Sequence, residues 1–153
     1  MRPSLFLHPG HLVASVEDAV IITILGSCVA VCLGDPSRHV GGMNHFQMPH
    51  GARNAIEPLR YGPSATLALF DRVIELGADR RRLEAKVFGG ASILPGTGGR
   101  VGGLGIENAD AALLTLAQLG VLVVETDVGG RLARKLVYRV EDGAVRVHRI
   151  SGT

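Results

Sequence analysis

A chain of 153 residues with 46% apolar side chains and a positive mean hydropathy is expected to fold as one globular domain over residues 1–153. Its 16 basic and 14 acidic residues nearly balance, which argues against the strong electrostatic affinity that nucleic-acid-binding proteins show. Two cysteines do not make a disulfide scaffold, and free thiols are typical of the reducing cytoplasm.

The first third of the chain is predicted to consist mainly of strands. Residues 1–10 contain two prolines and a glycine and are expected to form a loosely held arm. Four short apolar segments follow, and each is predicted to be a strand: 11–16, 20–25, 28–33 and 40–48. We expect the last three to be sequential antiparallel neighbours.

The uncharged stretch 19–34 raises the question of a membrane-spanning helix. It is 16 residues long and is interrupted by a Gly-Ser pair, whereas a spanning helix needs about 20 apolar residues. The N-terminus also lacks the pattern of a signal peptide. We therefore expect a cytoplasmic protein.

Two helices are expected in the rest of the chain. The first begins near Pro63 and ends at Gly77, and the second has Asn108 as its N-cap and ends at Gly120. A loop with eight glycines, residues 89–105, precedes the second helix. The remaining strands are predicted at 84–88, 121–126, 132–140 and 144–150, the last two forming a hairpin. Because the strands come in runs, the chain is assigned to the α+β class, with two helices covering a mostly antiparallel sheet.

The candidate chemistry centres on one cysteine and one histidine. Cys28 lies on the turn made by Gly26 and Ser27, and His45 follows seventeen residues later, in the next predicted strand. If the two strands pair, the thiol and the imidazole can meet, which is the minimal equipment of a cysteine nucleophile with its own base. The backbone N–H groups of Ser27 and Cys28 are candidates for holding an oxyanion.

Other interpretations of these residues remain open. A cysteine in an apolar strand is more often a small hydrophobic residue, which is the interpretation favoured for Cys32. A zinc site made of Cys28, Cys32, His45 and His50 is disfavoured, because the Cys-x₃-Cys spacing on a strand lacks the turn of structural zinc sites. The glycine-rich loop has no Gly-Lys-Ser/Thr ending, so it is expected to shape a groove rather than bind a nucleotide.

Four motifs occur in order along the chain. They are LGSCVAVCL at 25–33 followed by Asp35-Pro36, GGMNHFQMP at 41–49, FGGA at 88–91, and DVGGR at 127–131 followed by Arg134-Lys135. Together they resemble the CheD family of chemoreceptor glutamine deamidases over about residues 12–148. The resemblance implies an α/β/β layered sandwich similar to that of toxin deamidases.

The resemblance also implies roles for particular residues. Cys28 corresponds to the nucleophile and His45 to the general base and acid. The family's histidine-orienting threonine falls in register on Ile22, and Thr23 is the only threonine of that strand. A substrate groove is implied at Phe88, Gly89, Gly90 and Asn108. Glu107 stands where the family commonly has an arginine.

The function implied is hydrolysis of glutamine side-chain amides in methyl-accepting chemotaxis receptors, through a Cys thioester, in chemotaxis adaptation. No metal or organic cofactor is implied. The partners are the cytoplasmic helices of the receptor, through which alone the protein reaches the membrane, and a CheC-type phosphatase. Two alternatives stay open: a regulatory binding module that acts through the CheC-type partner, and a thiol amidase that acts on another protein.

Overall fold

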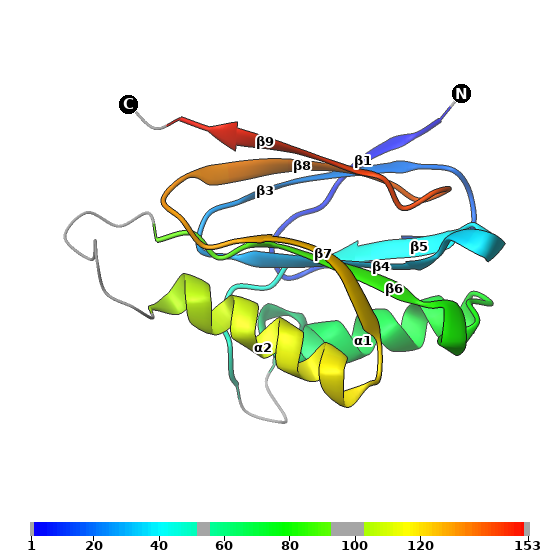
Figure 1. Cartoon of the computed structure of the whole chain (residues 1–153), viewed down its shortest axis with the longest axis horizontal. Coiled ribbons are helices and arrows are strands. Elements are labelled where there is room, and N and C mark those ends of the chain that lie inside the picture. The colour runs from blue at the N-terminus through cyan, green and yellow to red at the C-terminus, as the bar shows by residue number, and fades with distance from the viewer. Residues whose placement is uncertain (1, 52–55, 93–102, 152–153) are drawn as a thin grey trace.

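Two stacked β-sheets and one layer of helices make up the computed structural model, which describes residues 2–51, 56–92 and 103–151 (Figure 1). Sheet A has the strand order β1-β3-β8-β9, and sheet B has the order β2-β5-β4-β6-β7. The helices α1 and α2 cover the face of sheet B that points away from sheet A (Figure 1). This is the layered α+β arrangement that the order of the predicted elements indicated.

The bounds of the elements are as follows. Sheet A contains β1 (Ser4–Phe6), β3 (Val20–Leu25), β8 (Ala133–Arg139) and β9 (Val145–Ile150). Sheet B contains β2 (Leu12–Ser15), β4 (Val29–Asp35), β5 (Val40–Asn44), β6 (Glu84–Gly89) and β7 (Leu122–Val128). The helices are α1 (Gly62–Glu75) and α2 (Leu104–Gln118), with short 3₁₀ turns at Pro36–Arg38, Pro58–Arg60 and Arg80–Arg82.

Strand β4 lies at the centre of the molecule, and all of its residues are buried. Val29, Val31 and Leu33 belong to the core that faces the helices. Ala30 and Cys32 belong to the core between the two sheets. Because side chains alternate across a strand, a strand that is covered on both faces must be apolar throughout. This explains the uncharged stretch of the sequence.

The predicted succession of three neighbouring strands is only partly correct. β4 and β5 are antiparallel neighbours, with Cys32 opposite Met43. β3, however, lies in sheet A between β1 and β8. The turn at Gly26 and Ser27 carries the chain from one sheet to the other. The two flanking strands are equally apolar, so their composition does not reveal that they belong to different layers.

The N-terminal residues are not the loosely held arm that was predicted. β1 pairs in parallel with β3, with Leu5 opposite Ile21, and Leu7 is 1% exposed in the core between the sheets. Pro3 and Pro9 flank this strand, which lies at the edge of sheet A. Prolines are tolerated around edge strands because fewer backbone N–H groups are needed there.

The start of the second helix also differs from the prediction. α2 begins at Leu104, so Asn108 lies inside the helix and is not its N-cap. Its predicted start was misplaced because the helix begins within a run of glycines. A Cβ atom on Gly105 would collide with the carbonyl of Gly90, and so this glycine is required by close packing. The central part of the predicted glycine-rich loop, residues 93–102, lies outside the described residues.

If the N-terminal segment is structural, truncating Leu7 should destabilise the whole fold. Leu7→Ala removes a buried side chain between the sheets and is expected to lower the free energy of unfolding by about 2–5 kcal/mol. Leu5→Ala, at a side chain 39% exposed on the same segment, should cost less than about 1 kcal/mol. Urea denaturation measures both. Equal, small effects would show that the segment is a loose arm after all.

Candidate active site

Cys28 and His45 flank the paired ends of two central strands. Cys28 immediately precedes β4, and His45 immediately follows β5. The pairing extends beyond β5 through a bridge in which Val29 and Phe46 exchange both backbone hydrogen bonds (3.1 and 3.0 Å). In this register Cys28 and His45 are diagonal neighbours, which lie within reach of each other across antiparallel strands. Cys28 packs against the core between the sheets, and no hydrogen bond joins it to His45 in the described part of the structure.

The two strands separate locally beside His45. Between the Cys32–Met43 and Val29–Phe46 pairs, the side chain of Asn44 accepts the hydrogen bond of the Val31 N–H at 2.9 Å. The backbone of His45 turns instead to the segment before β2, where it bonds to Gly10 and His11. These hydrogen bonds fix the backbone of His45, and its imidazole extends toward Thr23 of sheet A.

Thr23 holds the imidazole from the opposite sheet. Its Oγ1 lies 2.7 Å from Nδ1 of His45 and 2.8 Å from the carbonyl oxygen of Leu7. A carbonyl cannot donate, so the Thr23 hydroxyl donates to Leu7 and accepts from Nδ1–H. The proton of the neutral imidazole therefore sits on Nδ1, and Nε2 carries a lone pair. Nε2 is buried and has no hydrogen-bond partner among the described residues.

The position of Thr23 resolves the choice between it and Ile22. β3 alternates, and Ile21, Thr23 and Leu25 are buried on its inner side. Ile22 is on the outer side of sheet A. Of the two residues, Thr23 alone is therefore placed to contact the histidine.

Burial keeps both members of the pair neutral. It lowers the pKa of His45 to about 4. It raises the pKa of the Cys28 thiol, and the N–H of Cys28 offsets this only in part. Desolvation disfavours the charged form of either group. At neutral pH the site therefore holds a thiol and a neutral imidazole rather than a thiolate–imidazolium pair.

Three successive carbonyls of the cysteine turn are held by hydrogen bonds. The Gly26 and Cys28 carbonyls accept from the N–H groups of Ala91 and Gly90 at 3.0 and 2.9 Å. The Ser27 carbonyl accepts from the Asn108 side chain at 2.9 Å. The N–H groups of Ser27 and Cys28, by contrast, donate to no neighbouring carbonyl in the described ranges. The turn is thus fixed through its oxygens and leaves these N–H groups available.

Asn108 joins the two halves of the site. Its Nδ2 donates to the carbonyl of Ser27, before the cysteine, and to that of Gln47, after the histidine, at 2.9 and 3.0 Å. The side chain is fully buried. One amide on α2 therefore ties the turn before Cys28 to the segment after His45.

Arg134 supports the same turn from sheet A. Its guanidinium donates to the carbonyls of Gly89 (2.8 Å) and Gly129, pairs with Asp127 at 3.3 Å, and is almost fully buried. Gly89 has a φ of +109°, and a Cβ there would collide with the carbonyl of Cys28. The end of β6 can therefore pass directly beneath the nucleophile turn only as glycine.

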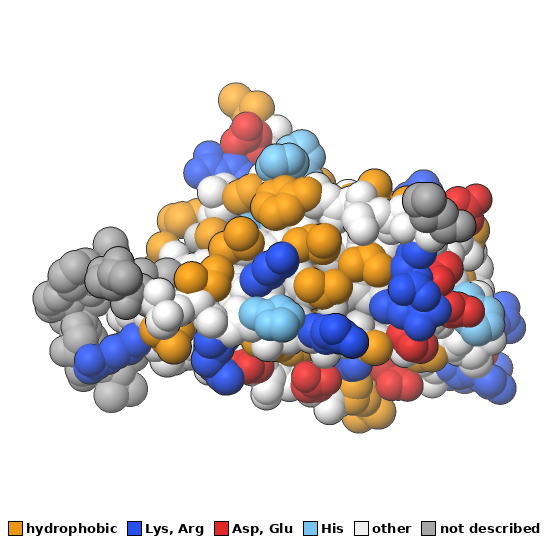
Figure 2. All heavy atoms as spheres, turned by 90° about the horizontal axis from the view of Figure 1, so that it is seen from above, with side chains coloured by type: hydrophobic (Ala, Val, Ile, Leu, Met, Phe, Trp, Pro, Cys, Tyr) orange, Lys and Arg blue, Asp and Glu red, His pale blue; other side chains and the backbone are white. Residues whose placement is uncertain are grey.

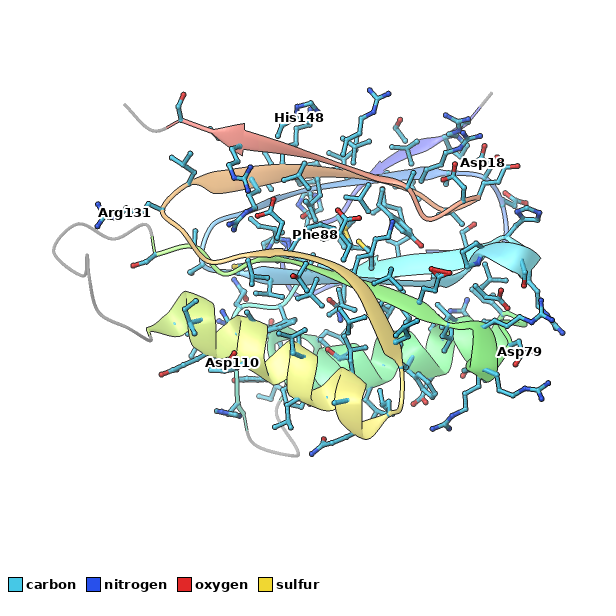
Figure 3. All side chains as sticks on the ribbon, viewed as in Figure 1. Asp18, Asp79, Phe88, Asp110, Arg131 and His148 are labelled. Carbon is cyan, nitrogen blue, oxygen red and sulfur yellow. The ribbon has the colours of Figure 1, made fainter. Side chains whose placement is uncertain are left out.

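The predicted groove residues are not at an open surface. Phe88 is fully buried and lies between the two sheets (Figure 3), and Asn108, Gly89 and Gly90 are buried as well. They support the cysteine turn from behind. Sequence reasoning assigned no role to Arg134 and Asn44. Arg134 lies on the same face of its strand as Leu136 and Tyr138, which is a signal of a buried, paired cation.

The described residues contain no group of three or more His, Cys, Asp or Glu side chains that could hold a metal ion. Cys32 is a free, buried thiol in the core between the sheets. Among the described residues, no helix is long and apolar enough to cross a membrane.

Comparison with known proteins gives consistent matches. A family model described as CheD chemotactic sensory transduction matches residues 47–149. A protein of Anaeromyxobacter dehalogenans named probable chemoreceptor glutamine deamidase CheD 1 is 44% identical over 97% of this chain and 86% of its own length. A similarly named protein of Trichlorobacter lovleyi is 40% identical over 94% of this chain and 89% of its own length.

Among solved structures, a Neisseria meningitidis protein of the DUF152 family is similar with a TM-score of 0.43. The sequences are 12% identical, and the match covers 89% of this chain and 74% of that one. This likeness is too weak to support an argument.

The buried neutral histidine should make stability pH-dependent. The pKa of His45 is 6.5 when unfolded and about 4 when folded, so the unfolded chain binds more protons between these values. The free energy of unfolding should therefore fall by about 3 kcal/mol as the pH drops from 7 to 4 on account of this residue. In His45→Gln that part of the fall should disappear, whereas His148→Gln, on the surface, should retain it. Urea denaturation across this pH range measures the difference, and identical slopes would contradict the assignment.

Asn108 should contribute to stability through the two carbonyls that it satisfies. Asn108→Leu leaves the oxygens of Ser27 and Gln47 without their donor, and we expect a loss of about 2–5 kcal/mol. Thr115→Val on the same helix removes a hydroxyl that bonds only the Ala111 carbonyl of its own helix and should cost less than about 1 kcal/mol. Urea denaturation compares the two. Similar losses would mean that Asn108 is only a packing residue.

Proposed function

The chain belongs to the CheD family, and from this membership and the geometry of its site we propose that it is a chemoreceptor glutamine deamidase. It converts glutamine side chains of chemoreceptors to glutamate. The observation that carries the proposal is the imidazole of His45: Thr23 holds it through Nδ1, and the unpartnered Nε2 is buried in the layer that also contains Cys28. That is the arrangement a thiol nucleophile needs from its base.

The reaction proceeds through a thioester. Nε2 of His45 takes the thiol proton as Sγ of Cys28 attacks the carboxamide carbon, and the N–H groups of Ser27 and Cys28 stabilise the oxyanion. The imidazolium then gives the proton to the departing amine, and ammonia leaves. Water, deprotonated by His45, hydrolyses the thioester, so that glutamate and the free thiol result.

The reaction starts from a neutral Cys28 thiol and a neutral His45 imidazole when substrate binds. Because burial raises the pKa of Cys28 and lowers that of His45, the resting thiol is not a reactive thiolate. Proton transfer and attack occur together when an amide carbon is in place. A thiol that stays protonated reacts more slowly in oxidation and alkylation, both of which need thiolate character.

Thr23 acts as the orienting residue. Its hydroxyl is committed to Leu7, so it presents only a lone pair to Nδ1 and fixes the tautomer in which Nε2 is the base. When His45 becomes charged, the same contact stabilises the Nδ1–H of the imidazolium.

We infer the partners and the place of action from the family resemblance. The substrate is a cytoplasmic helical segment of a chemoreceptor, the site of action is the cytoplasm, and a CheC-type phosphatase is a further partner. Glu107 is exposed in the first turn of α2, where the family commonly has an arginine, and it is placed to influence which receptor is used. A thiol amidase acting on another protein is the alternative, and it predicts labelling of Cys28 by thiol-directed probes without turnover of receptor.

Deamidation of a purified receptor fragment tests the mechanism. Cys28→Ala should abolish ammonia release. Thr23→Val should lower kcat at least about tenfold, since a lost hydrogen bond of about 1.4 kcal/mol in the transition state has that effect. Thr23→Ser, which keeps the hydroxyl, should recover most of the rate.

Two outcomes would count against the proposal. Full activity of Cys28→Ala would exclude the thioester mechanism. No deamidation by the wild type, together with undiminished binding of a CheC-type protein by Cys28→Ala, would favour the regulatory binding module.

A further inference from the structure

The outer face of sheet A carries apolar and basic side chains in adjacent rows. The strand registers place these residues side by side on the face that points away from sheet B. We call this set the sheet A face; it consists of Phe6, Ile22, Val137 and Arg146 in one row and Ile24, Lys135 and His148 in the next. Phe6 and Ile24 are 51% and 47% exposed. Neither helix covers this face, in contrast to the outer face of sheet B (Figure 1).

The charge on this face is of one sign. The four strands of sheet A contain no aspartate or glutamate. Arg134 and Arg149 pair with Asp127, and Arg139 pairs with Asp18 and Glu141. Lys135 and Arg146, in contrast, form no ion pair with any described residue. Figure 2 views this face directly and shows hydrophobic and cationic side chains intermingled at its centre, with the acidic ones toward the margins.

This segregation is not a consequence of overall charge, because the chain has a formal net charge of only +2. Unpaired cations beside exposed apolar side chains match a partner surface that offers carboxylates next to apolar groups.

The sheet A face lies close to the nucleophile. Ile24 is four residues before Cys28, so their Cα atoms are at most about 14 Å apart. Lys135 is the residue opposite Ile24 in β8. Packed helices lie about 8–10 Å apart, so a helix that packs beside the segment bringing a glutamine to Cys28 falls within this distance.

We propose that the sheet A face binds a receptor helix that carries glutamates and apolar residues, next to the helix or segment whose glutamine is at Cys28. The inference rests on the proposed function, because deamidation itself generates glutamates in the substrate. Lys135 and Arg146 contact the carboxylates, and Phe6 and Ile24 contact the apolar side chains between them.

Other occupants fit the face less well. A second copy of the chain would bring Lys135 and Arg146 against the same cations, which is repulsive. An anionic membrane is disfavoured by charge, because binding to anionic lipid typically uses a cluster of about 4–8 basic residues. On this face two cations, Lys135 and Arg146, form no ion pair with a described residue.

A double charge reversal tests the proposal. Lys135→Glu/Arg146→Glu is compared with Arg81→Glu/Arg82→Glu, an equal change in net charge at two exposed arginines of the 3₁₀ turn at Arg80–Arg82. In a Cys28→Ala background, binding of a purified receptor cytoplasmic fragment is measured by calorimetry. In the active protein, kcat and KM are measured for that fragment and the rate is measured for a short glutamine peptide.

The sheet A variant should bind the fragment at least about tenfold more weakly, because reversed charges repel the partner. Its KM should rise to match, while kcat and the rate on the short peptide stay at wild-type values. The control variant should differ from wild type by less than about twofold. Equal weakening in both variants, or in neither, would overturn the proposal.

Two further outcomes would show that the sheet A face binds something other than a receptor helix. If the wild type is a dimer that Lys135→Glu/Arg146→Glu dissociates, the occupant is a second copy. If this variant loses affinity for vesicles of anionic lipid but not for the fragment, the occupant is a membrane. A wild type that releases no ammonia from the fragment would refute the deamidase function, and the binding measurements would still decide whether the face contacts the receptor.

Discussion

The hydrogen bond between Thr23 and His45 is the interaction on which the site depends, because it is made between the two sheets. Thr23 belongs to sheet A, and His45 extends β5 of sheet B. Its 2.7 Å length therefore requires the correct spacing of the layers and the correct register of β3. A one-residue slip of β3 would place Ile22 or Ile24 against the imidazole and turn the hydroxyl to solvent. The core between the sheets, including Leu7, thus sets the distance between Thr23 and His45.

Burial of His45 affects both its basicity and the stability of the fold. The same desolvation that leaves Nε2 of His45 with a free lone pair also destabilises the fold when the histidine must take a proton. The contacts that fix the turn at Cys28 are made by uncharged groups. Asn108, Gly90 and Ala91 donate hydrogen bonds to its backbone carbonyls. Arg134, the one arginine or lysine that is buried among the described residues, pairs with Asp127 and donates to the Gly89 carbonyl.

The sequence predicted those parts of this arrangement that depend on local pattern. The pairing of the strands after Cys28 and before His45 followed from two apolar segments separated by a tight turn, and the helices followed from their spacing and their glycine stops. The placement of β3 in the other sheet, the choice of Thr23 over Ile22 and the inward direction of Asn108 depend on contacts between residues distant in the chain. Composition does not encode these contacts, because a strand buried in one sheet reads like a strand buried in the other. The family resemblance pointed to particular segments, but it could not orient the individual side chains within them.

The layer order separates the proposed catalytic pair from the proposed docking face. The helices bury one face of sheet B, His45 is buried between the two sheets with Cys28 half-buried at their edge, and neither helix covers the outer face of sheet A. Thr23 and Arg134 point inward from β3 and β8 and contact His45 and the Gly89 carbonyl. Their neighbours Ile24 and Lys135 are exposed and point outward from the same strands. Because adjacent residues of one strand face opposite sides, substitutions one position apart should affect different kinetic constants: kcat for the inward residues and KM for the outward ones. A short peptide, which reaches only the catalytic pair, should respond to the first set and not to the second.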